Sequence, residues 1–162
     1  MNYNLINIVN RTLDKLYHNE KVLFMTNSSE RNLVFHFTRY FCEEIKETIF
    51  SQYDVDCEYN RNAMSNRDVK EVLIEGNTKK SIIYPDFILH KRRTNDFNIL
   101  AIEFKKYSNS REKVCKRDKE KLKALTSVNA GFRYRLGLFI VFGKERDDVK
   151  ITRFVNGEVI DE

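Results

Sequence analysis

The sequence predicts an α/β domain with a central mixed β-sheet flanked by helices, and three observations lead to this fold class. Apolar residues recur at helical spacing in the segments 4–18, 27–49 and 111–126. Short apolar runs with strand character lie between the second and third of these segments and after the third. A strand, a helix and a further strand follow one another over 97–143, and such a unit can join parallel strands.

The first two predicted helices each carry one apolar stripe. Segment 4–18 has apolar residues three and four positions apart, which is the spacing of one helix face. In segment 27–49 one of residues 27–29 can act as the N-cap, and Asn27 with Glu30 has the spacing of a capping box. The stripe of this second helix consists of Leu33, Val34, Phe37, Phe41 and Ile45.

Acidic residues of the second helix differ in the direction that they face. At about 100° per residue, Glu30 falls on the axis of the apolar stripe and Glu44 near its edge, whereas Glu43 and Glu47 face solvent. An inward Glu30 can be the glutamate of a capping box or part of a functional site. The helix by itself favours the capping box.

Strand-like segments follow at 54–61, 69–74, 82–89, 97–104 and 136–143. The last, LGLFIVFG, is apolar throughout, which is typical of a strand buried on both faces. Between 97–104 and 136–143, the basic segment 111–126 keeps its apolar residues on one side, as expected of a helix that crosses the sheet. Asn156-Gly157, between two short apolar runs, predicts a two-residue hairpin.

The chain of 162 residues is long enough for one domain with a substantial core. We predict a single domain, 1–162, made of an N-terminal helical extension (1–26), a core (27–143) and a C-terminal hairpin (144–162). No apolar run reaches the roughly 18 residues of a membrane span. The three cysteines form no C-x-x-C pair, which suits a reducing compartment, so we expect a cytoplasmic protein without membrane association.

Charge is unevenly distributed along the chain. Residues 1–60 hold 6 Lys and Arg against 9 Asp and Glu, whereas the whole chain has a net charge of +5. The basic excess therefore lies in the second part, where residues 105–123 alone carry nine Lys and Arg against three acids. This distribution fits either a polyanionic partner such as nucleic acid or a solvated, lysine-rich surface.

Three charged residues interrupt the two most strand-like segments. Asp86 lies in 82–89, and Glu103 and Lys105 lie in 97–104 and just beyond it. Residues two apart in a strand share a face, so Glu103 and Lys105 point to one side. An antiparallel pair of these strands can bring Asp86 close to Glu103, given a suitable register.

Two neighbouring carboxylates repel unless a proton or a cation lies between them. Mg²⁺ and Mn²⁺ prefer oxygen ligands, so Asp86, Glu103 and the backbone carbonyl of Phe104 could bind one. Lys105 could then position a water and stabilise charge on a phosphate. The alternative is a turn residue at 86 and a solvated strand face at 103–105.

The pattern Pro85-Asp86, sixteen residues, then Glu103-Phe104-Lys105 resembles the PD-(D/E)xK motif of the restriction-endonuclease-like nuclease superfamily. The resemblance covers roughly residues 27–143. It implies an α/β core of a helix, three strands, a helix and a strand, with the motif on the second and third strands. It also implies an acidic residue from the first core helix in the metal site, a role that Glu30 matches best and Glu44 second.

The wider order of SER, EYNR, YPDFILHKR, IEFKK, DKEKL and YRLGLFIVF is similar to small bacterial nuclease-like proteins of unassigned function. By that similarity Asp118 and Lys121 are candidates for the rim of the site, although an ordinary surface ion pair three residues apart is the reading we favour. We expect nucleic-acid contacts, mainly to phosphates, from three basic segments beside the site. Their residues are Arg92, Lys106, Lys121, Arg133 and Arg135.

We therefore expect a Mg²⁺- or Mn²⁺-dependent nuclease that acts on DNA, with Asp86, Glu103, Lys105 and Glu30 as its catalytic residues. Asp86, Glu103, Glu30 and the Phe104 carbonyl are the expected metal ligands. Two alternatives stay open: an RNase, and a non-catalytic relative that binds nucleic acid or protein. No separate recognition domain is evident, so specificity could come from a homo-oligomer or a partner.

Overall fold

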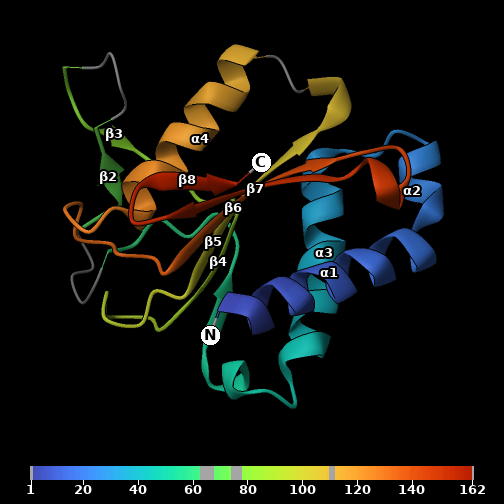
Figure 1. Cartoon of the computed structure of the whole chain (residues 1–162), viewed down its shortest axis with the longest axis horizontal. Coiled ribbons are helices and arrows are strands. Elements are labelled where there is room, and N and C mark those ends of the chain that lie inside the picture. Colours follow the sequence, from blue (N-terminus) through green and yellow to red (C-terminus); the bar gives the residue numbers. More distant parts are fainter. Residues whose placement is uncertain (1, 63–67, 74–77, 110–111, 162) are drawn as a thin grey trace.

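A six-stranded sheet forms the centre of the computed structural model, which describes residues 2–62, 68–73, 78–109 and 112–161 (Figure 1). Its strands lie in the order β1-β4-β5-β6-β7-β8, and only β5 and β6 are parallel neighbours. The sheet is therefore mixed, as predicted. The strands are β1 (Asp54–Asp56), β4 (Phe87–His90), β5 (Leu100–Lys106), β6 (Leu136–Phe142), β7 (Lys150–Val155) and β8 (Glu158–Asp161).

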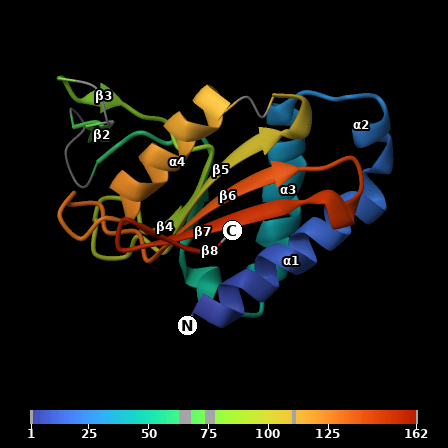
Figure 2. The ribbon, with the colours of Figure 1, turned by 45° about the horizontal axis from the view of Figure 1, so that its top comes forward.

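Helices cover both faces of this sheet. Figures 1 and 2 show α4 on one side and α1 with α3 on the other. The helices are α1 (Asn2–Asn19), α2 (Lys21–Met25), α3 (Glu30–Ile45) and α4 (Glu112–Thr126), with short 3₁₀ turns η1 (Ile49–Gln52), η2 (Tyr107–Asn109) and η3 (Arg146–Asp148). The three long helices agree with the apolar spacing of the sequence. No helix in the described part of the chain is long and apolar enough to cross a lipid bilayer.

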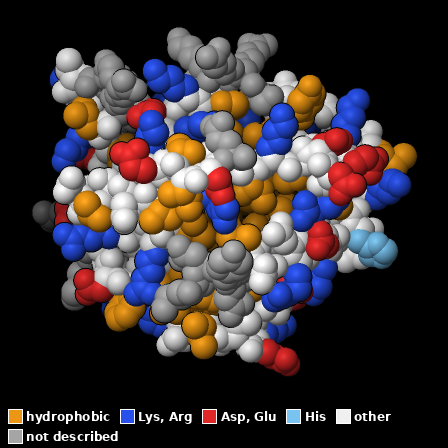
Figure 3. Space-filling view, viewed as in Figure 1, with side chains coloured by type: hydrophobic (Ala, Val, Ile, Leu, Met, Phe, Trp, Pro, Cys, Tyr) orange, Lys and Arg blue, Asp and Glu red, His pale blue; other side chains and the backbone are white. Residues whose placement is uncertain are grey.

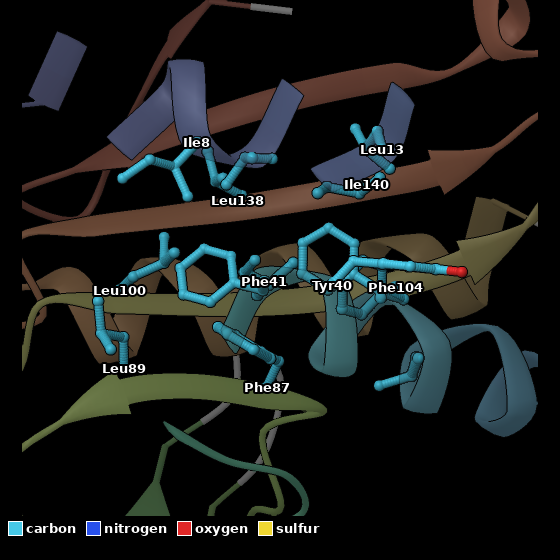
Figure 4. Close-up of a cluster of buried hydrophobic side chains, with 14 of the residues drawn as sticks. Ile8, Leu13, Tyr40, Phe41, Phe87, Leu89, Leu100, Phe104, Leu138 and Ile140 are labelled. Atoms are coloured by element: carbon cyan, nitrogen blue, oxygen red, sulfur yellow. The ribbon is translucent and has the colours of Figure 1, made fainter. Parts of the chain in front are cut away.

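Alternation along β5 separates two hydrophobic layers. Leu100, Ile102 and Phe104 pack with α1 and α3, and Figure 4 shows their neighbours from β4 and β6 in the same cluster. Ala101 packs in the second layer, with apolar residues of α4. Because residues two apart share a face, the α4 side of β5 continues from Ala101 to Glu103 and Lys105.

Three predicted strands are shorter than the sequence suggested. The segment 82–89 is broken, since β3 (Ser81–Ile82) ends before Pro85 and β4 begins after it. Proline has no N–H for a sheet ladder, which explains the break. β3 pairs instead with β2 (Glu71–Val72) in a separate two-stranded sheet; the end of segment 69–74 lies outside the described residues.

Segment 54–61 forms a strand only over β1, and the chain leaves the sheet near Glu58, whose φ is 50°. The second helix also ends earlier than expected, at Ile45 instead of about 49. The predicted hairpin is present, because β7 and β8 are joined by Asn156 (φ 54°) and Gly157 (φ 85°). A tight type I′ turn requires positive φ angles at both of its central residues.

Helix α4 approaches the sheet closely at Gly137 of β6. A Cβ atom at this position would lie 2.9 Å from Cγ2 of Thr126 and 3.2 Å from Cβ of Phe154. We expect Gly137→Ala to lower the free energy of unfolding by about 1–3 kcal/mol, because the helix would have to move. Thr126→Ser removes that methyl group but keeps a hydroxyl, so it should restore part of the loss in the double variant. Urea unfolding of the four proteins measures this coupling, and additive effects would contradict the contact.

Candidate active site

The register of β4 and β5 places the two carboxylates of the sequence motif opposite each other. Phe87 pairs with Ile102, and the same register carried one residue further sets Asp86 against Glu103. Oδ2 of Asp86 accepts a 2.7 Å hydrogen bond from the backbone N–H of Phe104. The side chain of Asp86 is thereby fixed where β4 begins.

Glu103 is almost completely buried, with 1% of its surface exposed. Its Oε2 accepts a 2.7 Å hydrogen bond from Nζ of Lys121 on α4. Its Oε1 is buried and has no hydrogen-bond partner within the described residues. A buried carboxylate oxygen without a partner is costly, so this atom marks a place where a further group would be stabilised.

Asp118 links two lysines, Lys105 and Lys121. We call the group of Asp86, Glu103, Asp118, Glu30, Lys105 and Lys121 the cluster. Nζ of Lys121 lies 2.8 Å from its Oδ1, and Nζ of Lys105 lies 3.0 Å from its Oδ2. Asp118 is buried, so the expectation of an ordinary surface ion pair at 118 and 121 was wrong. The sequence did carry a signal, since Asp118 lies four and seven residues before Leu122 and Leu125, on the apolar face of the helix.

Glu30 joins the cluster from the first turn of α3. Its Oε2 accepts a 2.9 Å hydrogen bond from the backbone N–H of Lys106, and its Oε1 lies 3.4 Å from Nζ of Lys105. The predicted capping box with Asn27 is wrong, because Ser29 is the N-cap and its hydroxyl accepts from Asn32 N–H. Glu30 therefore binds residues of β5 instead of capping its own helix.

The second choice on this helix, Glu44, lies elsewhere. It pairs with Arg11 and Lys15 of α1 at 2.6 Å each and takes no part in the cluster around Asp86. Nζ of Lys106 is also directed away, because it donates to Oδ1 of Asn27 at 2.6 Å and to the loop before α3.

Burial dominates the electrostatics of the two carboxylates. It raises the pKa of Asp86 from 3.8 to about 6, although the hydrogen bond from Phe104 opposes this. Burial and then the charge of Asp86 raise the pKa of Glu103 well above its ordinary value. Burial by itself would lower the pKa of Lys121, but the negative charges of Glu103 and Asp118 outweigh burial, so the pKa of Lys121 is raised. Two acids that resist ionisation beside firmly charged lysines are typical of functional sites.

The donor set fits a small divalent cation in part. Asp86 and Glu103 supply carboxylate oxygens, and the backbone carbonyl of Phe104 follows directly after Glu103 in the sequence. Mg²⁺ commonly binds through one or two carboxylates plus water and substrate oxygens. Within the described ranges, no three His, Cys, Asp or Glu side chains form a group that could hold a metal. Both oxygens of Glu30 contact lysines, so its direct ligation stays a prediction.

Three of the predicted nucleic-acid contacts lie away from this cluster. Arg92 follows β4 and binds Asp56, with 2.6 Å between Nη2 and Oδ1. Arg133 precedes β6, and the N–H of Arg135 donates to Asn98 just before β5. These arginines are at the opposite end of the strands from Glu103, so the expectation that their segments adjoin the site was wrong. For Arg92 the reason is the antiparallel turn, which sends the end of β4 away from the end of β5. Arg133 and Arg135 precede β6, which is parallel to β5 and begins beside Leu100, at the start of β5.

A second polar cluster was not predicted. Nε2 of His90 lies 2.9 Å from Oδ2 of Asp56, which also binds Arg92. His90 and Asp56 belong to adjacent strands, β4 and β1, and neither has a motif-like spacing in the sequence. Burial lowers the pKa of His90 although Asp56 opposes this. This cluster joins β1 to the turn after β4.

Comparison of the chain with models of protein families, with curated proteins and with solved structures finds no match in any of the three. The case for a function therefore depends on the residues and geometry described above.

Proposed function

We propose that the chain is a Mg²⁺- or Mn²⁺-dependent nuclease that hydrolyses phosphodiester bonds of DNA. The observation that carries this proposal is the pair of opposed carboxylates, Asp86 and Glu103, of which Glu103 has a buried oxygen without a hydrogen-bond partner in the described part of the chain. Among the described residues, this cluster brings the carboxyl groups of Asp86, Glu103, Asp118 and Glu30 together with the ammonium groups of Lys105 and Lys121. When all four acids are ionised, a divalent cation would balance the two negative charges in excess over these two lysines.

The order of elements supports the finer fold assignment, a restriction-endonuclease-like core. Helix α3 precedes three strands that are neighbours in the sheet, β1, β4 and β5, and then α4 leads to β6 parallel to β5. The β2–β3 pair is an insertion between the first two of these strands. Asp86 directly precedes the second of these strands, and Glu103 and Lys105 lie on the third, which supports the position that the resemblance implies for the motif.

Each residue has a role in this proposal that follows from its position. Asp86, Glu103 and the Phe104 carbonyl would hold the cation, which supplies Lewis-acid stabilisation and lowers the pKa of a bound water. Lys105, whose ammonium group is held by Glu30 and Asp118, would position the attacking water and stabilise charge on the phosphate. Asp118 and Lys121 would keep Glu103 and Lys105 in place.

Contacts to the nucleic-acid backbone would come from the basic side chains. Lys121 belongs to the cluster, and Lys106 meets it through its backbone N–H while its Nζ lies at the loop before α3. Arg92, Arg133 and Arg135 would contact phosphates farther along the strand. Such contacts give affinity with little sequence information. Figure 3 shows Lys and Arg side chains spread around hydrophobic ones that gather near the middle of one face.

One observation favours the alternative of a non-catalytic binding protein. Nζ of Lys121 lies 2.7 Å from Glu103, so an ion pair already stabilises one potential ligand. A protein that only binds nucleic acid would keep this pair closed, and divalent ions would leave its stability unchanged.

Cleavage assays with single-stranded DNA, duplex DNA and RNA in Mg²⁺, Mn²⁺ or EDTA test the proposal. We expect metal-dependent cleavage of DNA that falls at least about 100-fold in Asp86→Asn and Lys105→Ala, since each removes a group from the reacting centre. Glu44→Gln is the matched control, because Glu44 is also ion-paired but lies outside the cluster. Cleavage of RNA alone would support the RNase. Salt-sensitive binding without cleavage, unaffected by Asp86→Asn, would support the non-catalytic protein.

A further inference from the structure

A pocket of about 470 Å³ opens beside the proposed active site. Asp86 and Glu30 form part of its wall, so the carboxylates face the space in which a substrate would lie. This volume is within the range of about 300–1,000 Å³ that small-molecule sites occupy. The pocket is therefore large enough for one nucleobase next to the cluster.

The wall formed by α3 carries one aromatic and one aliphatic side chain beside polar ones. Phe35 lines the pocket with 62% of its surface exposed, and Val34 lies beside it. The ring of Phe35 meets His36 edge to face, with 5.2 Å between the ring centroids, and the rest of the ring is open to solvent. Exposed aromatic rings are surfaces on which bases of single strands stack. The charged residues of this pocket are three carboxylates and one arginine, so stacking and not charge would supply the attraction for a base.

The polar groups of the pocket favour stacking over reading of a base. The hydroxyl of Thr38 donates to the carbonyl of Val34 at 2.8 Å and lies 3.2 Å from the sulfur of Cys57, so its hydrogen-bonding capacity is used within the protein. At the mouth, Arg31 is 88% exposed and lies 3.3 Å from Glu58. Its guanidinium group can reach a phosphate, which complements the negative charge of a strand.

We propose that this pocket binds an unpaired nucleobase adjacent to the phosphodiester bond at Asp86 and Glu103, and that the preferred substrate is single-stranded DNA. The inference rests on the proposed function, because that function places the cleaved bond at the carboxylates. A paired base is stacked within the duplex and enters such a pocket only after unpairing, at a cost in free energy. Stacking on Phe35 tolerates any base, so sequence preference should be weak.

Binding can be measured apart from cleavage. A single-stranded oligonucleotide that carries 2-aminopurine is titrated with protein in EDTA, and base stacking is followed by the fall in fluorescence. We expect Phe35→Ala to weaken binding about tenfold or more, and Phe35→Trp to restore it. Phe97→Ala is the control, since Phe97 is also an exposed phenylalanine but precedes β5 at the other end of the strands.

Cleavage in Mn²⁺ gives the second measurement. Phe35→Ala should lower kcat/KM on a single strand about tenfold and change the value on a matched duplex much less. Equal losses on both substrates, or no effect of Phe35→Ala on fluorescence, would overturn the pocket while leaving a nuclease possible. Phe35-dependent stacking by a wild-type protein that cleaves nothing would support the base pocket and overturn the nuclease.

Discussion

Lys121→Met should destabilise the protein by about 3–5 kcal/mol at neutral pH, because it removes the ammonium group bound to the buried Glu103 and leaves Asp118 paired with only Lys105 of these two lysines. Lys121 binds both Glu103, which is 1% exposed, and Asp118, which is 6% exposed. Methionine keeps the length and the apolar stem of the side chain, so the loss reports on charge rather than on packing. Urea unfolding in EDTA measures it.

Addition of Mg²⁺ or Mn²⁺ tests whether Glu103 is a metal ligand or only a partner in an ion pair. If Glu103 is a metal ligand, a divalent cation should recover part of the lost stability in Lys121→Met, since binding to the native state stabilises it by mass action. Lys123→Met is the control on the same helix. Its ion pair with Glu120 involves a lysine that is 42% exposed, so a change within about 0.5 kcal/mol is expected. No recovery at millimolar metal would contradict metal binding at Glu103.

Asp86→Asn should have the opposite effect and stabilise the metal-free protein by about 3 kcal/mol at pH 7.5. Burial raises the pKa of Asp86 in the folded protein from 3.8 to about 6, so the folded state holds this proton more tightly than the unfolded chain. The stability that this group contributes is present below its unfolded pKa and is lost as the pH rises through about 6. Asparagine does not ionise and keeps an oxygen that can accept from Phe104 N–H.

The stability difference between Asp86→Asn and wild type should therefore be larger at pH 7.5 than at pH 4.5. Unfolding by urea in EDTA at the two pH values measures it. Glu44→Gln should change stability in the other direction at pH 7.5, because the hydrogen bonds from Lys15 and Arg11 lower the pKa of Glu44. A destabilised Asp86→Asn at both pH values would show that Asp86 has a structural role that outweighs its cost of burial.

Local spacing predicted the fold class well because each long element is amphipathic or apolar throughout. The α3 stripe, the buried β6 and the Asn156-Gly157 turn are all properties of neighbouring residues. The broken strand at Pro85 and the short β1 were missed, since where pairing ends depends on the partner strand and not on the segment alone. The order of the strands in the sheet is likewise set by contacts distant in sequence.

The candidate site was predicted in outline from three residues, Asp86, Glu103 and Lys105, because strand alternation fixes which side chains share a face. The central position of Asp118 was missed, although its place on the apolar face of α4 indicated burial. The positions of Arg92 and Arg135 were misjudged, since charge near the motif in sequence does not determine which end of a strand a residue occupies.

The bond from the Lys106 amide to Glu30 joins residues 76 positions apart. Local fraying of β5 alone would not be expected to release this amide, because α3 must also separate from the strand. We therefore expect its hydrogen exchange to be among the slowest at this end of β5, and to follow global unfolding instead of local opening. The cluster would then form late as the chain folds, when distant segments dock. A partly folded chain would lack a complete set of these charges, so the site on which the proposed activity depends would be complete only when the whole fold is.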